Sequence, residues 1–584
     1  MLLAIWVTNV SATDISVPAN GTDTDLAAAL EQASTGDKIL ISGYLTFSAP
    51  VAITKNVTIE GTTGNDGFDG NGVTQLFDIN PEVIEGAQLL FKDLVFYNGN
   101  NTAGDGGAAI FNGGTTQFIR CYFEENQVTG PGGRGGAFYA QNAGTNISFD
   151  GCDFTSNKTG NRGGCAFITG DVNTAWNYCH IVGNKTGLDG ESRGGGLWIE
   201  GAGTHRFFYS TIDGNSAGEL DQGGERGGGA FVVNGPSAIT FESSAIVNNI
   251  AFGNHGGAFF IMNTPNITFI NSIVANNLTK TGAGGWFLAT DNVNITFVNT
   301  IVADNKGDNA GNGGGGLRVM NLGNKINVFN SLIVRNLDNA SAGIDFRFGG
   351  PNQIKNVVVK NSIIGLMSGY PDGEAVTLED NAAIPTASLV NMYRLGSEDD
   401  QPNYADLDVS GIDFADGLQL SSDFKMPYYT LKSNTVTAAK LGDPALLLDR
   451  DLDVDMFLVK RATAADGSIF AGPVQSVTGE AVVNDAGWED NLPTGIISPK
   501  APLVQKDNIQ IIGTVSNGIL GVNYGNLKGQ AKGELISLTG QVVENVFNIN
   551  VVGKGYYNVN AAPGVYVLRV TIAGNVYSQK LIVQ

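Results

Sequence analysis

Residues 132–141 read GGRGGAFYAQ, and the same phrase returns as NRGGCAFITG at 161–170, GESRGGGLWIEG at 190–201 and GERGGGAFVVNG at 224–235. Each copy places an arginine, a run of glycines and a large apolar residue in one order. A catalytic motif occurs once in a chain, whereas a phrase that returns at a regular interval indicates a repeat architecture. This phrase therefore decides the fold.

Three columns of residues recur with the phrase. The aromatic column, aligned on the residue five after the arginine, comprises Ala109, Phe138, Phe167, Trp198, Phe231, Phe259, Phe287 and Arg318, at steps of 28 to 33 residues. Two positions before each member lies a glycine, except at Cys165. The asparagine column comprises Asn126, Asn157, Asn184, Asn215, Asn249, Asn277, Asn305 and Asn336, at steps of 27 to 34 residues.

Short β-branched and aromatic runs, such as NITFINS (266–272) and NITFVNT (294–300), lie between these columns, and turn residues separate them. A unit of about 30 residues with two or three strands fits one turn of a parallel β-helix, because a propeller blade needs about 40 or more residues. We therefore predict an all-β, right-handed parallel β-helix (solenoid) of about eight to ten turns, stacked about 4.8 Å apart. A short capping helix is expected from about Asp25 to Ala33, with Asp23 or Thr24 as its N-cap.

Each column has a structural explanation. Paired glycines permit positive φ and close approach of successive turns, and stacked asparagines can hydrogen-bond along the solenoid axis. Cys121, Cys152 and Cys179 share a column with serines and a threonine, which favours buried thiols over disulfides. The aromatic column forms either an inward core or an outward platform. The core is favoured because six exposed aromatics would promote aggregation.

Charge and hydropathy restrict the partners of the chain. Its 584 residues carry a net charge of -23, and the pI is about 4.4, which argues against nucleic acid and anionic membrane surfaces. The sequence contains no run of 18 apolar residues, so no membrane span is predicted. The opening MLLAIWVTNVSATD has a short apolar run that ends in small residues, and we interpret residues 1–12 as the remnant of a signal peptide.

The helix, the strand TIEG and the serial GGAF or GGGL units resemble the right-handed parallel β-helix proteins of the pectate-lyase-like superfamily. Within it, the chain is most similar to bacterial surface proteins with polymorphic-outer-membrane-protein-type repeats. The stretches 429–447 and 466–472 look like the closing segment of such proteins. We therefore assign 13–475 to the solenoid, with an acidic C-terminal cap or insertion at about 370–475. The resemblance leaves activity open, because this superfamily includes lyases, hydrolases and adhesins.

The end of the chain has a second resemblance. A linker at 476–507 precedes GELISLTGQVV (533–543), NAAPGVYVLRV (560–570) and a final YSQKLIVQ. In this order the pieces resemble the C-terminal sorting domain of type IX secretion substrates of Bacteroidota, so 508–584 is predicted to be a small β-sandwich of that kind. The resemblance implies that the type IX machinery is a partner, and that the chain is secreted or displayed on the surface of a Gram-negative bacterium.

The arginines are the candidate ligand-binding residues. Arg162, Arg193 and Arg226 fall in register in the alignment, and Arg134 is shifted by one. One interpretation is a basic stripe that holds the carboxylates or sulfates of an extended polysaccharide, for which the guanidinium fork is suited. The other, which we favour, is a structural ladder of arginines with nearby carboxylates. Those carboxylates are Glu191, Asp221 and Glu225.

Two acidic clusters are candidate calcium sites. Asp66 and Asp69 lie in GNDGFDGNG, while Asp449, Asp451 and Asp453 alternate in DRDLDVD. Neither matches an EF-hand or a nonapeptide calcium repeat, and alternate aspartates in a strand also share a solvated face. No other cofactor is predicted. The three histidines fall in different columns, so we interpret them as incidental surface or turn residues.

From these observations we expect an exported, non-catalytic surface protein that acts in adhesion, glycan contact or assembly with itself or other surface proteins. The alternative is a secreted lyase or glycoside hydrolase acting on acidic polysaccharide, which the superfamily suggests and the missing catalytic motifs oppose.

Overall fold

The computed structural model describes residues 12–187 apart from Asn65, most of 192–338, separate strands between 346 and 431, and most of 510–583. Within 192–338 the gaps are 220–226, 254–255, 264, 281–286, 290–292, 304, 308–316, 320–324 and 335. The signal remnant other than Ala12, and the whole predicted linker 476–507, lie outside the described residues.

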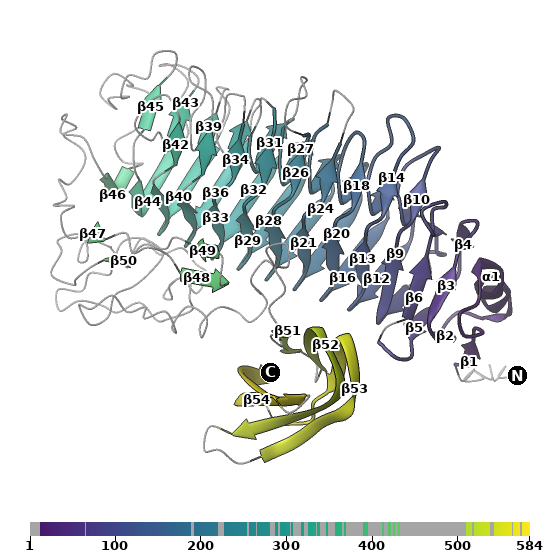
Figure 1. The fold of residues 1–584 in the computed structure, drawn as a ribbon. Coiled ribbons are helices and arrows are strands. Elements are labelled where there is room, and N and C mark those ends of the chain that lie inside the picture. Colours follow the sequence, from purple (N-terminus) through teal and green to yellow (C-terminus); the bar gives the residue numbers. More distant parts are fainter. Residues whose placement is uncertain are drawn as a thin grey trace, which may run out of the picture.

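A parallel β-solenoid of about 10 turns occupies the larger part of the described chain (Figure 1). One representative turn consists of β15 (Phe138–Ala140), β16 (Asn146–Asp150), β17 (Asp153–Thr155) and β18 (Lys158–Thr159). The next turn repeats them as β19 (Ala166–Ile168), β20 (Asn173–Asn177), β21 (His180–Val182) and β22 (Lys185–Thr186). Each strand pairs in parallel with its counterpart one turn later. The predicted solenoid is confirmed.

The strand segments of successive turns stack into sheets. One sheet of 12 strands carries the residues of the repeated phrase. Its members are β4 (Val51–Ile53), β7 (Phe77–Ile79), β11 (Ala109–Phe111), β15, β19, β23 (Leu197–Glu200), β27 (Phe231–Asn234), β31 (Phe259–Met262), β35 (Phe287–Ala289), β39 (Leu317–Val319), β43 (Phe346–Phe348) and β45 (Met367–Gly369). Two-residue strands from β10 (Asn100–Asn101) to β42 (Leu337–Asp338) form a second sheet.

The remaining strands of each turn belong to one large sheet that holds two rows. One row includes β12 (Thr115–Ile119), β16, β20, β24 (Thr204–Phe208), β28 (Ala238–Glu242), β32 (Asn266–Ile270), β36 (Asn294–Val298), β40 (Lys325–Phe329) and β44 (Val357–Ile364). The other includes β13 (Tyr122–Glu124), β17, β21, β25 (Thr211–Asp213), β29 (Ala245–Val247), β33 (Ile273–Ala275), β37 (Ile301–Ala303) and β41 (Leu332–Val334). The strand β46 (Leu389–Arg394) adds to β44, so pairing extends into the predicted cap region.

The first helix covers the N-terminal end of the solenoid. Helix α1 (Asp23–Gln32) begins two residues earlier than expected, and its N-cap is Thr22 rather than Asp23 or Thr24. The Thr22 N–H and hydroxyl both bond to the Asp25 carboxylate, at 2.8 and 2.9 Å. Leu26 and Leu30 are buried against the first turn. At the other end, Lys55 Nζ donates to the carbonyls of Leu30 and Ala33 at 2.7 Å, where a cation offsets the helix dipole.

The aromatic column of the alignment is two columns in the structure. Phe138 pairs with Ala166, and Tyr139 with Phe167, so Phe167 and Trp198 lie one position beyond the column that holds Phe138. The sequence alignment places the aromatic residues in one column. In the folded chain, the glycine corners of successive turns are in register instead. Because side chains alternate in a strand, this single step moves Phe167 and Trp198 to the outer side.

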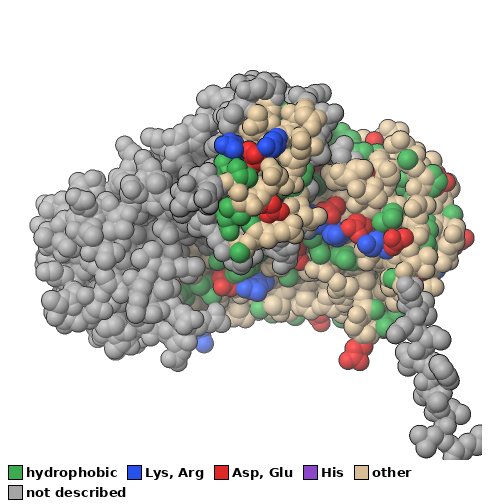
Figure 2. Space-filling model, turned by 90° about the horizontal axis from the view of Figure 1, so that it is seen from below, with side chains coloured by type: hydrophobic (Ala, Val, Ile, Leu, Met, Phe, Trp, Pro, Cys, Tyr) green, Lys and Arg blue, Asp and Glu red, His purple; other side chains and the backbone are tan. Residues whose placement is uncertain are grey.

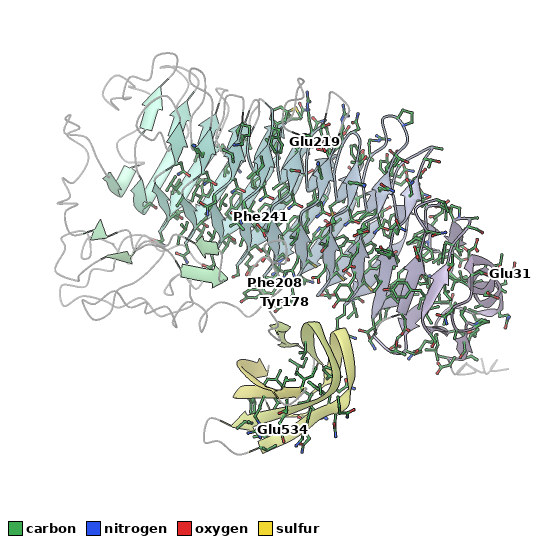
Figure 3. All side chains as sticks on the ribbon, in the orientation of Figure 1. Glu31, Tyr178, Phe208, Glu219, Phe241 and Glu534 are labelled. Carbon is green, nitrogen blue, oxygen red and sulfur yellow. The ribbon has the colours of Figure 1, made fainter. Side chains whose placement is uncertain are left out.

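Phe138 and other members of the inward column pack in the core with the aromatics of the large sheet. The Phe149 and Trp176 rings lie 4.5 Å apart, and Phe231 and Phe259 stack at 5.0 Å with an interplanar angle of 7°. Phe241, which is labelled in Figure 3, is 0% exposed, and its ring is 4.9 Å from that of Phe207. The predicted inward core is thus correct for Phe138, Phe231 and Phe259 and wrong for Phe167 and Trp198.

Paired glycines form the corner before this sheet, as the repeat predicts. Gly135 has a φ of 72°, and a Cβ on Gly136 would meet the carbonyl oxygen of Gly164 at 2.0 Å. The corner therefore needs one glycine for its backbone conformation and one for close approach of the next turn. Cys165 lies outside the glycine column, because its carbonyl accepts the Ala137 N–H at 2.7 Å, which places it with the small residues after the corner.

The asparagine column forms an unbroken internal ladder, which confirms its predicted function. Asn157, for example, donates from Nδ2 to Asn184 Oδ1 at 2.9 Å and to the Phe123 carbonyl at 2.9 Å. Asn184 repeats both bonds with Asn215 and the Phe154 carbonyl. All eight side chains are 0% exposed, so their polar groups are satisfied within the solenoid. We call these eight residues the asparagine ladder.

The cysteine and serine column forms a parallel ladder. Cys179 N–H donates to Ser210 Oγ at 3.1 Å, Ser210 N–H to Ser244 Oγ at 3.1 Å, and Ser244 N–H to Ser272 Oγ at 3.2 Å. All four cysteines are buried with reduced thiols in this structure. For the three in this column, that is the state that the sequence favours. The thiol–hydroxyl ladder is composed of Cys121, Cys152, Cys179, Ser210, Ser244, Ser272, Thr300, Ser331 and Ser362.

The C-terminal residues form a separate sheet, drawn in yellow-green in Figure 1. Its strand order is β51 (Gln510–Ser516), β55 (Asn575–Val583), β54 (Gly564–Ile572), β52 (Ile519–Ser537) and β53 (Val542–Asn558). Pairing among β52, β53 and β54 is antiparallel. Leu520, Leu535 and Leu568 lie in its apolar core. The sheet also closes on itself, because β51 pairs with β52 as well as with β55. These strands support the predicted small C-terminal β-sandwich in part.

Candidate functional site

An apolar stack lies on the outer side of the 12-stranded sheet. Tyr139, Phe167, Trp198, Val232 and Phe260 form a buried cluster of their own, separate from the main core. The Tyr139 and Phe167 rings are 5.4 Å apart at 14°, and those of Phe167 and Trp198 are 5.8 Å apart at 8°. We call these five residues the outer stack. Its members are at most 6% exposed although they point away from the core.

The arginines of the repeated phrase lie over this stack. Arg134 Cζ is 4.8 Å from the Tyr139 ring centroid and 4.7 Å from that of Phe167. Arg162 Cζ is 4.6 Å from the Trp198 ring, and Arg193 Cζ is 5.7 Å from that of Phe260. Cations at these distances are attracted by the ring quadrupole. Sequence reasoning missed this partnership, because it placed the rings on the inner side.

The arginine register differs from the alignment by one residue. Arg134 bridges to Arg162 in parallel, Arg162 to Arg193, and Arg193 to Gly227. Arg134 is therefore in register, and Gly227 takes the equivalent position on the next turn. Arg226, which precedes Gly227, lies outside the described residues, as do the three carboxylates expected to brace the ladder.

Arg134 is also held by a carboxylate that the alignment did not single out. Its Nε and Nη2 donate to Asp105 Oδ1 and Oδ2 at 3.1 and 2.7 Å, and its backbone N–H donates to Oδ1 at 2.9 Å. This pairing raises the pKa of Arg134 above its usual value. A bidentate bond and two ring faces leave the guanidinium plane with little freedom.

A polar hollow of about 420 Å³ opens beside these arginines. It is lined by Ala103, Gly104, Asp105, Pro131, Gly132, Gly133, Arg134, Asn161 and Arg162. Residues from three successive turns therefore meet at one surface. The structure brings Arg134 and Arg162 together at this hollow, which we call the arginine corner.

A second aromatic group lies at another corner of the solenoid, and the sequence reasoning missed it. Tyr178, Phe208 and Tyr209 are partly exposed, and the Tyr178 and Tyr209 rings stack at 5.3 Å and 15°. Figure 3 shows the labelled Tyr178 and Phe208 close together at the edge of the solenoid. Both tyrosines have positive φ, 55° and 47°, at a position where other turns use residues such as Gly151 and Asn271. A bulky residue in this conformation is strained.

Arg206 completes this tyrosine corner. Its Cζ lies 4.6 Å from the Phe208 ring centroid, and its Nη2 bonds to Glu242 Oε2 at 3.0 Å. It therefore repeats, on a different face, the arginine–ring–carboxylate arrangement of Arg134. The column alignment contained a signal for this group, because Tyr178 and Tyr209 directly precede the thiol–hydroxyl column.

An acid–imidazole pair lies on the outer side of the large sheet. Asp153 and His180 are register neighbours in β17 and β21, and His180 Nδ1 is 2.9 Å from Asp153 Oδ1. On the next turn, His180 pairs with Thr211 of β25, and Asp213 lies two residues after Thr211. Asp213 is 5% exposed, and burial raises its pKa to about 7. His180 had been interpreted as incidental, but the aligned column CDF, CHI, STI already placed it beside Asp153.

The carboxylates of the first predicted calcium cluster accept hydrogen bonds from backbone N–H groups. Asp66 is 0% exposed and accepts bonds from the Gly43 N–H at 2.6 Å, the Thr63 N–H at 2.5 Å and the Thr63 hydroxyl at 2.8 Å. Asp69 accepts the Asn71 N–H at 2.7 Å. Among the described residues, no three His, Cys, Asp or Glu side chains gather as a metal site. Asp449, Asp451 and Asp453 lie outside them.

Charged side chains elsewhere alternate in sign. Glu60 binds both Lys38 and Lys92, at 2.9 and 2.6 Å, and Arg120 binds Asp93 at 2.6 Å. Figure 2 shows basic and acidic side chains next to each other on the described part of one face. No helix of the described chain is long and apolar enough to cross a membrane.

The fold and its ladders define the chain as a parallel β-solenoid repeat protein. No protein-family model matches the sequence. A search of curated proteins likewise finds no match.

Proposed function

We propose that this protein is an exported, non-catalytic solenoid that contacts acidic polysaccharide through its arginine corner. The observation that carries the proposal is the pair Arg134 and Arg162, which lie on successive turns with their guanidinium groups against aromatic rings, beside a polar hollow. Asp105 already pairs with Arg134 and holds its guanidinium group, which agrees with the structural ladder that the sequence favours. Groups ordered in this way before binding lose little conformational entropy when a ligand arrives. The turn spacing of about 4.8 Å repeats along the rod and suits an extended polymer.

Surface localisation rests on the C-terminal sequence. The motifs GQVV, PGVY and the lysine-containing last strand support recognition of residues 508–584 by the type IX secretion machinery of a Gram-negative bacterium. Deleting 508–584 in a bacterium that has this machinery is expected to retain the chain inside the cell. Immunodetection of the intact and shortened chains in cell and medium fractions tests this, and equal export of both contradicts it.

A second candidate function has an observation of its own. The Asp153 and His180 pair has the arrangement of a carboxylate that orients an imidazole. The other ring nitrogen, Nε2, is buried in this structure and would have to become exposed to act as a general base. It favours the alternative of a lyase or hydrolase that acts on acidic polysaccharide. In that case His180→Gln would abolish activity, whereas the arginine variants would weaken substrate binding.

One experiment separates the two functions. The full chain is incubated, with calcium present, with polygalacturonate, alginate, chondroitin sulfate and neutral dextran, and both binding and new reducing ends are measured. We expect binding to one or more acidic polymers without new reducing ends. Arg134→Gln and Arg162→Gln should each weaken binding about tenfold, equivalent to about 1.4 kcal/mol. The matched control is Arg206→Gln, which removes a similar stacked and paired arginine from another face.

New reducing ends that His180→Gln abolishes would replace the binding proposal with catalysis. Equal loss of binding in the control and the two test variants would show that overall charge, rather than the arginine corner, holds the polymer. Absence of binding to every acidic polymer would contradict the proposed function.

A further inference from the structure

Three thiols stack inside the solenoid, between the two rows of the large sheet. Cys121, Cys152 and Cys179 occupy equivalent positions on three successive turns, and all are 0% exposed. The Cys121 N–H points at Cys152 Sγ at 3.4 Å. We propose that this stack is a covalent modification site, at which Cys152 forms a disulfide with the cysteine of a neighbouring turn. The inference is independent of the glycan proposal.

The geometry identifies Cys152 as the shared partner. Adjacent turns are about 4.8 Å apart, within the Cα separation of about 4.4–6.8 Å that a disulfide spans. Cys121 and Cys179 are two turns apart, about 10 Å, and cannot be joined directly. Cys165 belongs to another column, where it bonds to Ala137 and Gly196. One disulfide in the stack therefore leaves one stacked thiol and Cys165 reduced.

The serines of the thiol–hydroxyl ladder show what a cysteine changes at these positions. From Ser210 onward a hydroxyl accepts the N–H of the preceding turn at 3.1 to 3.2 Å. A thiol is a weaker acceptor, so three consecutive cysteines weaken the hydrogen bonding at this end of the ladder. A covalent bond between turns offsets that loss. Serine is also the natural occupant of the column, which makes Cys→Ser the conservative test substitution.

The bond forms by thiol–disulfide exchange while the chain folds. In the folded solenoid, burial raises the pKa of Cys121 and Cys179 well above the usual thiol value, and buried thiols of this kind are unreactive. During folding, the Cys152 thiolate attacks a small-molecule disulfide, forming a mixed disulfide and releasing one thiolate. A neighbouring cysteine thiolate then attacks the Cys152 sulfur and releases the second thiolate. The two thiol protons of the protein pass to the released thiolates.

The test counts thiols in the full chain. Reduced, unfolded protein is refolded with reduced and oxidised glutathione, quenched with acid, unfolded again and alkylated with iodoacetamide. Two of the four cysteines are expected to escape alkylation, with a mass loss of about 2 Da before alkylation, the two hydrogens removed. A peptide map should join Cys152 to Cys121 or Cys179. The same count on chain produced in an oxidising bacterial periplasm gives the result without refolding.

Variants identify the residue that the bond requires. Cys165→Ser should still lose two thiols to the disulfide, whereas Cys152→Ser should leave every remaining thiol open to alkylation. Circular dichroism of both variants checks that the strands are retained. Four alkylated thiols in the oxidised wild-type chain would overturn the inference. A bond that includes Cys165, or one that survives in Cys152→Ser, would overturn it as well.

Discussion

The asparagine ladder and the outer stack each contribute one residue per turn, but they differ in how much the residue type varies from turn to turn. The ladder keeps one residue type from Asn126 to Asn336, and every member is 0% exposed. The outer stack changes from tyrosine to phenylalanine, tryptophan and valine along the same axis. Each asparagine must satisfy donors and acceptors on two neighbouring turns, whereas a ring need only cover apolar area. Directional bonds therefore require one residue type along the solenoid, whereas apolar packing requires only that each side chain present an apolar surface.

The largest expected effect comes from breaking the asparagine ladder in its middle. Asn215→Ala removes the acceptor of two Asn184 donors, at 2.9 Å each, and the donor that satisfies the Ile181 carbonyl at 2.8 Å. Leaving these buried groups unpaired should lower the free energy of unfolding by about 3–5 kcal/mol, measured by denaturant titration. The matched control is the exposed Asn173→Ala, which should cost no more than about 0.5 kcal/mol. Similar losses in the two variants would contradict this comparison.

The second effect concerns a carboxyl buried on the outer side. Burial raises the pKa of Asp213 to about 7, so the folded state keeps a proton that the unfolded state loses near pH 4. Stability should therefore fall as pH rises from about 4 to 7. Asp213→Asn should remove up to about 4 kcal/mol of that fall, at about 1.4 kcal/mol per pKa unit. Denaturant titrations from pH 4 to 8 measure it, with the exposed Asp171→Asn as control. An unchanged slope in Asp213→Asn would contradict the prediction.

The third effect has the opposite sign and concerns His205, which is 1% exposed within β24 and not the surface or turn residue that the sequence suggested. Burial lowers the pKa of His205 to about 4, and its Nδ1 lies 2.9 Å from Thr174 Oγ1. The unfolded chain therefore binds a proton more readily, and stability should be lost as pH falls from about 6.5 to 4. His205→Ile, which copies the next residue in this column, Ile239, should reduce the acid loss by up to about 3 kcal/mol. Urea denaturation at pH 4 and pH 7 tests this. Equal acid sensitivity in wild type and variant would show that other groups control it.

The smallest effect tests the outer stack. Arg162→Ala removes a guanidinium 4.6 Å from the buried Trp198 ring and should cost about 1–2 kcal/mol of unfolding free energy. Arg206→Ala removes a similar contact from a half-exposed pair and should cost less than about 1 kcal/mol. Thermal or denaturant unfolding of both variants provides the comparison. A larger loss at Arg206 would show that ring burial does not decide the strength of these contacts.

Much of the solenoid was predictable, because the spacing between equivalent residues of a repeated sequence gives the length of one turn. The spacing of the asparagines identified the turn length, and the shared column of cysteines and serines identified a small buried position. The paired glycines predicted a tight corner, which Gly135 and Gly136 form. Each of these inferences needed only the recurrence of one residue type, or of similarly small residues, at one position. A register error of one residue in the aromatic column did not affect them.

The candidate sites were less predictable, because they depend on which side of a strand a residue faces. Aligning the phrase on its rings placed Phe167 and Trp198 inside, and it concealed their contacts with Arg134 and Arg162. The pairs Asp153–His180 and Arg134–Asp105 join residues 27 and 29 positions apart in the chain. Stacking brings such residues together. The aligned column indicated the first pair, whereas no recurring residue type indicated the second.

The sequence by itself determined the repeat, the class of fold and the buried ladders, because equivalent positions on successive turns must satisfy one another. The tertiary structure decided the register of the phrase, the exposure of the rings and the partner of each arginine. The physical reason is strand alternation, since a shift of one residue exchanges the inner and outer sides while leaving the period unchanged.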